Sequence, residues 1–176
     1  MRRGDSRRGR SLILRFPDWR PPLQTTPSNY LPFAALLVRV ALAASFLSAV
    51  ADRFGLWGAP GEGEVSWGNM DNFLAHTQLL LWYLPPSLAN VAGWAATILE
   101  IVLAAALLVG VAIRLVALAS GGLLLIFAFS MTLGTGAEGA LSYSVWTAAA
   151  AALLLAALDP ASLGPAIGSS TSGPAD

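Results

Sequence analysis

Two charged residues lie inside apolar stretches of this sequence. Arg39 falls within the otherwise apolar run from Leu31 to Ala51, and Glu100 interrupts a second run that follows Asn90. On insertion scales each charge alone would cost about 2.5–3.5 kcal/mol near the centre of a membrane helix. Because an ionisable residue inside a membrane segment is by default a candidate functional group, these two side chains are the first place to look for chemistry.

We expect Arg39 and Glu100 to form a buried ion pair. If their helices run antiparallel, both residues lie close to a helix midpoint and at depths within roughly 5 Å of each other. Such a pair has two interpretations, which the sequence leaves open. It either fixes the register of two helices without chemistry, or provides the polar floor of a site for a quinone headgroup, an ion or another substrate.

Three further residues are candidate ligand-binding groups. Arg53 lies fourteen positions after Arg39 and therefore shares its helix face. Asp52 opens a segment rich in glycine and proline, which favours turns. His76 is the single histidine; the ordinary interpretation is an interfacial residue, and the alternative is a group that gates protonation at an outer site.

Missing residue types exclude several kinds of chemistry. The chain has no cysteine, which excludes disulfides, thiolate zinc sites and iron–sulfur clusters held by this chain. All ten positive charges are arginine, so no lysine can form a Schiff base, and one histidine cannot supply bis-histidine haem ligation. We therefore expect no metal site and no covalent cofactor, and a bound quinone is the cofactor that stays open.

The composition indicates a membrane protein. Of 176 residues, 56% are hydrophobic and 11% are charged, whereas soluble domains carry about 25% charged residues. A spanning helix needs about 20 mostly apolar residues. The sequence predicts an all-α integral membrane protein, an antiparallel four-helix bundle, in residues 30–159. Its helices are expected at about 31–51, 90–112, 115–133 and 141–158, with an outer loop over 52–89 that contains a short interfacial helix from Asn72 to Tyr83, ended by Pro85-Pro86.

The arginines predict the orientation. Seven of the ten lie in the first twenty residues, and Arg114 lies in the short link after the second span. Arginine-rich segments stay cytoplasmic, so both termini are expected in the cytoplasm. Residues 1–29 and 160–176 are predicted to be disordered tails. A signal peptide cleaved after Ala49-Val50-Ala51 is the competing interpretation, but Arg39 fits poorly into its apolar region.

Several sequence patches resemble the DoxX family of small four-helix bacterial membrane proteins. They are Arg39, the stretch Ala51-Asp52-Arg53-Phe54-Gly55 with Gly58, the patch Trp67-Gly68-Asn69, Pro85, Glu100 with Gly110 and Arg114, and Ser142-Tyr143-Ser144-Val145. The resemblance covers roughly residues 30–158. It implies a location in the bacterial inner membrane and a role as a subunit of quinone- or sulfur-linked redox systems, since the family takes its name from a subunit of thiosulfate:quinone oxidoreductase.

The expected function is therefore a DoxX-like membrane subunit or accessory of a quinone- or sulfur-linked redox system, with a buried Arg/Glu polar site. The alternatives are a small transporter or permease component and a structural membrane scaffold without chemistry. Expected partners are the lipid bilayer and redox-enzyme subunits, and self-association stays open. Nucleic acid is not an expected partner, because most arginines lie in the N-terminal tail rather than on a folded face.

Overall fold

The computed structural model describes residues 30–63 and 65–158, so both predicted tails lie outside the described residues. The described part contains six helices and no strand, and the loop 54–69 joins the first two helices. They are α1 (Leu31–Arg53), α2 (Met70–Leu80), α3 (Pro86–Val109), α4 (Ile113–Gly134), α5 (Ala137–Ser142) and α6 (Val145–Ala157). Among the described helices α1, α3 and α4 are long and apolar enough to cross a membrane, which indicates a membrane protein.

The second predicted span begins and ends earlier than the sequence indicated. Pro85-Pro86 was expected to delay this helix to residue 90, but α3 starts at Pro86. Proline suits this place, because the first turn of a helix has no acceptor for its N–H and needs the φ that proline fixes. The helix ends at Val109 because Gly110 adopts the left-handed conformation, with φ at 84°.

The fourth predicted span, 141–158, is not one helix. It is divided into α5 and α6 at Tyr143 and Ser144, and Ser144 has a positive φ of 56°. A left-handed residue turns the chain out of a helical path, so the two helices meet at a break. The predicted interfacial helix is present as α2, which begins at Met70, where the side chain of Asn69 accepts a hydrogen bond from Asn72 N.

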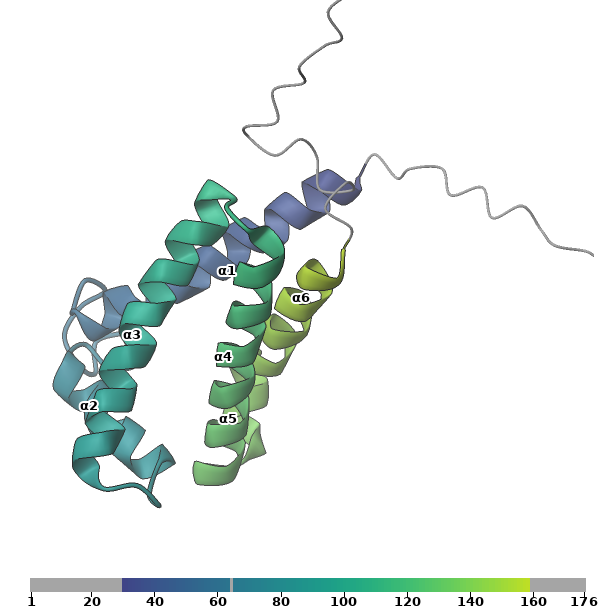
Figure 1. Cartoon of the computed structure of the whole chain (residues 1–176). Coiled ribbons are helices and arrows are strands. Elements are labelled where there is room, and N and C mark those ends of the chain that lie inside the picture. Colours follow the sequence, from purple (N-terminus) through teal and green to yellow (C-terminus); the bar gives the residue numbers. More distant parts are fainter. Residues whose placement is uncertain (1–29, 64, 159–176) are drawn as a thin grey trace, which may run out of the picture.

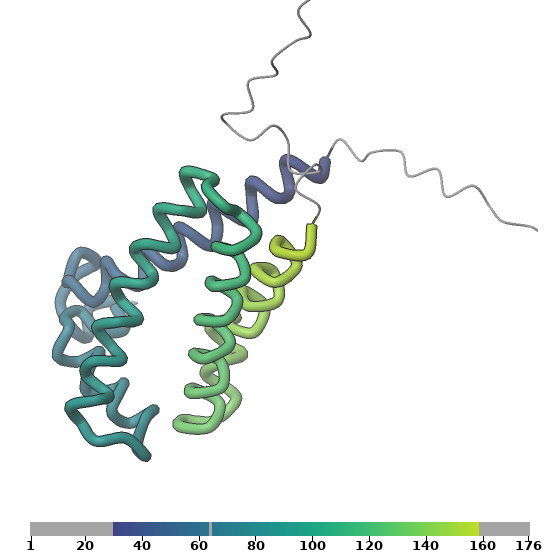
Figure 2. Tube along the Cα trace, in the orientation of Figure 1, coloured from purple at the N-terminus to yellow at the C-terminus, as the bar shows by residue number. Residues whose placement is uncertain are grey.

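The long helices pack in pairs (Figure 1). α1 lies against α3, and α4 lies against α6. α2 packs against the N-terminal part of α3. α3 and α4 are joined by the short turn 110–112 and diverge from it (Figure 2). The ends of the described chain lie toward this turn, whereas α2 and α5 lie at the opposite end, called here the α2 end.

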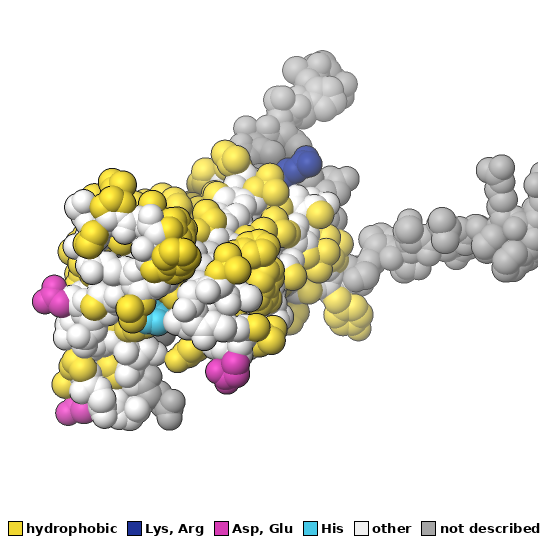
Figure 3. Space-filling model, turned by 90° about the horizontal axis from the view of Figure 1, so that it is seen from below, with side chains coloured by type: hydrophobic (Ala, Val, Ile, Leu, Met, Phe, Trp, Pro, Cys, Tyr) yellow, Lys and Arg dark blue, Asp and Glu magenta, His cyan; other side chains and the backbone are white. Residues whose placement is uncertain are grey.

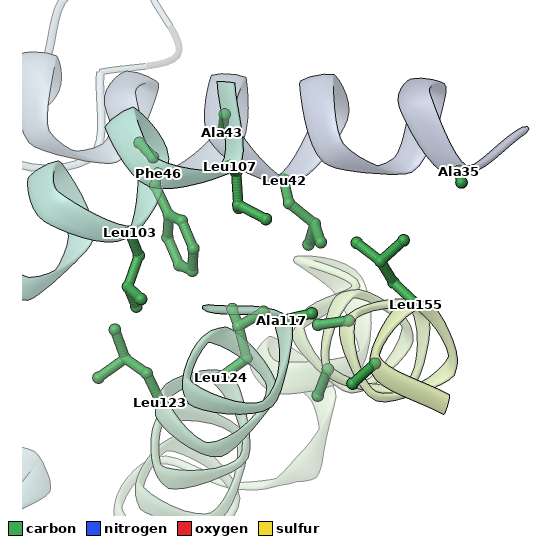
Figure 4. Close-up of a cluster of buried hydrophobic side chains, with 14 residues drawn as sticks. Ala35, Leu42, Ala43, Phe46, Leu103, Leu107, Ala117, Leu123, Leu124 and Leu155 are labelled. Atoms are coloured by element: carbon green, nitrogen blue, oxygen red, sulfur yellow. The ribbon is translucent and has the colours of Figure 1, made fainter. Parts of the chain in front are cut away.

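The core is formed by leucines between the helices and by alanines that let the backbones approach. Leu42 and Phe46 of α1 point toward the space that faces α4 and α6 (Figure 4). Leu103, Leu107, Leu123, Leu124 and Leu155 complete the cluster. Between membrane helices this packing, rather than exclusion of water, stabilises the contact.

The outward faces of the helices are apolar as well. Large hydrophobic side chains such as Leu37, Val102 and Leu154 are exposed. An exposed apolar surface of this extent is what contact with lipid requires, since a water-soluble protein keeps such patches small.

Candidate functional site

A buried ion pair joins the end of α1 to the middle of α3. The Arg53 guanidinium donates to both carboxylate oxygens of Glu100, with N···O distances of 2.5 and 2.9 Å. Glu100 is 1% exposed and Arg53 is 4% exposed. Arg53 Nη1 also donates to Thr97 Oγ1, which in turn donates to Gly93 O one turn earlier on α3. Two parallel N–H···O bonds hold a carboxylate in a defined orientation.

The predicted pairing of Arg39 with Glu100 is wrong. Arg39 instead donates from Nε and Nη2 to Leu107 O, at 2.9 and 2.8 Å, and from Nη2 to Leu108 O. These carbonyls belong to the last turn of α3, where no backbone N–H of the helix is available to donate to them. Arg39 therefore caps the C-terminus of α3, where a cation is also favoured by the helix dipole.

The direction of the side chains explains this exchange of partners. Side chains on a helix lean toward its N-terminus. In this pair of helices that direction on α1 points toward the C-terminus of α3, as the contact of Arg39 with Leu107 shows. Arg39 thus leans away from Glu100, while Arg53 leans toward it. A similar depth of the two Cα atoms in the membrane does not predict which long side chains form an ion pair.

One face of α3, which includes several small residues, packs against the rest of the molecule. Gly93, Thr97, Glu100, Ala104 and Leu107 are all buried. The exposed Arg114 does not belong to it, since it lies in α4 beyond the turn.

α2 covers the ion pair from outside. The ring of Phe73 lies under the Arg53 guanidinium, with 3.8 Å from Cζ to the ring centroid. A Cβ on Gly93 would lie 2.7 Å from Leu74 Cδ2, so the absence of a side chain there allows α2 to approach α3. The cation–π contact and the close packing together exclude water from the pair.

Asp52 fixes the glycine-rich loop to the end of α1. Its carboxylate accepts hydrogen bonds from Trp67 N and Gly68 N, at 3.0 and 3.1 Å. Gly55 and Gly68 have positive φ, and a Cβ on Gly55 would lie 2.9 Å from Gly68 O. Two patches that are far apart in the sequence, 51–55 and 67–69, are therefore one structural unit, and Asp52 has a structural task in it.

His76 lies on α2 with its ring 4.6 Å from that of Trp67, measured between centroids. Partial burial lowers the pKa of His76 below its ordinary value, because it disfavours the charged imidazolium. The side chain is thus a neutral imidazole at pH 7, with one donor and one acceptor nitrogen.

A cavity of about 1620 Å³ lies between the helices and is open to the surface. Its exposed lining residues lie along α1, such as Ala41 and Ser45, and at the α2 end, such as Trp57 and Tyr143. Its walls come from α1, α2, α3, α4 and α6, and most of the lining side chains are apolar. Three of the predicted site residues line it: Glu100, Asp52 and His76. Arg39 and Arg53 are not among the lining residues.

Sequence reasoning missed several residues of this cavity. Phe127 and Met131 carry no pattern that marks them as site residues, and both line the cavity. Tyr143 lines the cavity as well and is 68% exposed, so it lies at the cavity mouth. The break at Ser144 brings this segment to the cavity. No residue pattern in 141–158 predicts that break.

The fold indicates a helical membrane protein, and its site is a buried ion pair beside an open cavity. Comparisons with protein-family models, with curated proteins and with solved structures found no match for this chain.

Proposed function

We propose that this chain is a DoxX-like integral membrane subunit that binds a quinone-class lipophile for a redox partner. The observation that carries the proposal is the cavity beside Glu100. Ligand sites are typically apolar cavities with a few placed polar groups, of about 300–1,000 Å³ for drug-sized molecules. A cavity of about 1620 Å³ has room for a headgroup and part of an isoprenoid tail.

In this proposal the chain crosses the bacterial inner membrane four times as an antiparallel bundle. α1, α3 and α4 each form one span, and α5 with α6 together form the fourth. Residues 137–157 would cover about 30 Å at 1.5 Å per residue, less whatever the break at Ser144 removes. The arginine-rich N-terminal segment supports a cytoplasmic location of both termini.

The cavity residues fit a quinone by hydrogen-bonding type. Each carboxylate oxygen of Glu100 receives one hydrogen bond from Arg53 and has capacity for another. Because Glu100 is 1% exposed, a lining side chain must move aside before the carboxylate can accept from a hydroxyl of the reduced form. Neutral His76 and the indole N–H of Trp67 are donors that suit a quinone carbonyl. When bound, a quinone supplies the capacity to carry electrons and protons through the membrane.

Binding of decylubiquinone to the purified protein in dodecyl maltoside tests this proposal. We expect saturable quenching of tryptophan fluorescence. Ala96→Phe should weaken binding at least about tenfold, because Ala96 lines the cavity one turn from Glu100. Ala105→Phe is the matched control, since Ala105 is exposed on the same helix and does not line the cavity.

Non-saturable quenching, or an equal response of the two variants, would refute the quinone site. The Arg53–Glu100 pair would then have the role of a structural lock between α1 and α3. Uptake of a solute into proteoliposomes without quinone binding would favour the permease alternative.

A further inference from the structure

The charged groups of the cavity are all of one sign. Asp52, Glu62 and Glu100 line it, and the fourth ionisable lining side chain apart from Tyr143 is the neutral His76. Within the described residues no arginine lines the cavity. Arg53 is the ion-pair partner of Glu100, whereas the carboxylate of Asp52 accepts hydrogen bonds from two backbone N–H groups and has no arginine partner among the described residues.

The surroundings of the mouth add to this negative field. The described acids at this end, Glu62, Asp71 and Glu138, are exposed, and the sequence of the loop 54–69 contains no lysine or arginine. Seen from below, acidic side chains and a histidine lie on the near face, whereas an arginine side chain (dark blue) lies on a more distant part of the molecule (Figure 3). A cleft with low-dielectric walls and charges of one sign concentrates counter-ions of the opposite sign.

Aromatic rings accompany the acids at the mouth. Trp57 and Tyr143 line the cavity and are 62% and 68% exposed, and Trp67 lies between Phe73 and His76. Aromatic faces beside carboxylates attract organic cations, which shed their weak hydration easily. The interior beyond the mouth is apolar and accepts a hydrocarbon body.

We propose that the cavity binds lipophilic cations, with the charged group at the acidic aromatic mouth and the hydrocarbon body between α1, α3 and α4. The same field disfavours lipophilic anions, including fatty acids. This inference rests on the cavity as the ligand site of the proposed function, but not on quinone as its ligand. Glu62 is the residue that sets the charge preference, because it is exposed at the mouth and has no cationic partner among the described residues.

Tetraphenylphosphonium and tetraphenylborate test the proposal, because they have nearly the same shape and opposite charge. Their dissociation constants are measured by isothermal titration with the full-length chain in dodecyl maltoside. The quantity compared is the change between wild type and Glu62→Gln, in which partitioning of each ion into the detergent cancels. Glutamine retains an oxygen that can accept the hydrogen bond from Ala59 N.

We expect Glu62→Gln to weaken binding of the cation at least about threefold and to leave or strengthen binding of the anion. Added salt should reduce the difference, because the mouth is solvent-exposed. Glu138→Gln is the matched control. Glu138 is an exposed carboxylate at the same end of the molecule, accepts a hydrogen bond from Ser142 Oγ, and does not line the cavity.

An equal response of both ions to Glu62→Gln, or an equal effect of Glu138→Gln, would overturn the proposal. So would decylubiquinone binding without any binding of the cation, and in that case the proposed quinone site would stand. If neither decylubiquinone nor the cation binds, both proposals fail.

Discussion

At the scale of single residues, the Arg53–Glu100 pair makes a definite prediction. Glu100→Ala leaves a buried guanidinium without its counter-ion, and breaking a buried pair in this way costs about 3–5 kcal/mol. We therefore expect a large drop in the thermal unfolding temperature of the protein in detergent micelles. The loss is expected even though Thr97 Oγ1 remains as an acceptor for Arg53.

Charge exchange distinguishes the two arginines. The double variant Arg53→Glu with Glu100→Arg should be more stable than either single variant, because the two side chains are in direct contact. The combination of Arg39→Glu with Glu100→Arg should show no such recovery, since Arg39 bonds to backbone carbonyls of α3. Recovery with Arg39 instead of Arg53 would contradict the pairing described above.

His76 makes the stability depend on pH. Burial lowers its pKa in the folded state, so below its ordinary value of 6.5 the unfolded chain binds more protons than the folded one. The free energy of unfolding should therefore fall as the pH drops below about 6.5. Thermal unfolding between pH 8 and pH 5.5 measures this slope. His76→Gln should reduce the slope, whereas carboxylates that titrate in the same range act equally in both proteins.

The sequence predicted which charge is buried better than it predicted its partner. Glu100 could be found because a single acid interrupts a long apolar run, and seven-residue spacing placed Arg53 on the same face as Arg39. The choice between the arginines depends on the offset between α1 and α3 and on the lean of each side chain. Neither quantity is encoded in residue spacing along one helix.

At the scale of elements, the turn between α3 and α4 depends on Gly110. Its φ is 84°, and a Cβ there would lie 2.6 Å from Arg39 Nη2. Gly110→Ala should destabilise the protein by about 1–2 kcal/mol from backbone strain, plus the cost of moving Arg39 off its carbonyls. Gly122→Ala in α4 is the control, because nothing lies within 4 Å of the new methyl group. Equal unfolding temperatures for the two variants would contradict this account.

Helix ends were the least predictable elements. Apolar runs located α1, α3 and α4 to within a few residues, since composition alone determines which segments suit lipid. Their ends depend on local conformations: Pro86 starts a helix it was expected to precede, and Ser144 breaks one that was expected to be continuous. A serine rarely adopts a positive φ, so nothing at this position of the sequence predicts it. The packing of the surrounding structure holds the residue in this strained conformation.

At the scale of the whole molecule, the charges are sorted by position. Acidic residues gather at the α2 end, in the loop 54–69 and on α2 and α5, whereas Arg39 and Arg114 lie toward the turn between α3 and α4. A distribution of this kind orients a membrane protein, because arginine-rich segments stay on the cytoplasmic side. It also means that a ligand arriving at the cavity mouth meets carboxylates first.

Cysteine labelling tests this orientation and the number of spans together. The native chain has no cysteine, so each single-cysteine variant carries one thiol. A membrane-impermeant maleimide applied to spheroplasts should label Glu62→Cys and should label Arg114→Cys only after permeabilisation. Both native residues are exposed, so the substitutions disturb little packing.

Ala157→Cys, at the exposed end of α6, decides between three and four crossings. α6 has 13 residues, fewer than the about 20 that a span needs, and only together with α5 does it approach that length. If the α5–α6 pair crosses, Ala157→Cys should behave like Arg114→Cys and be protected in spheroplasts. Labelling together with Glu62→Cys would mean that α5 and α6 fold back to the same side, and the cavity wall formed by Tyr143 and Ala148 would then be re-entrant rather than transmembrane.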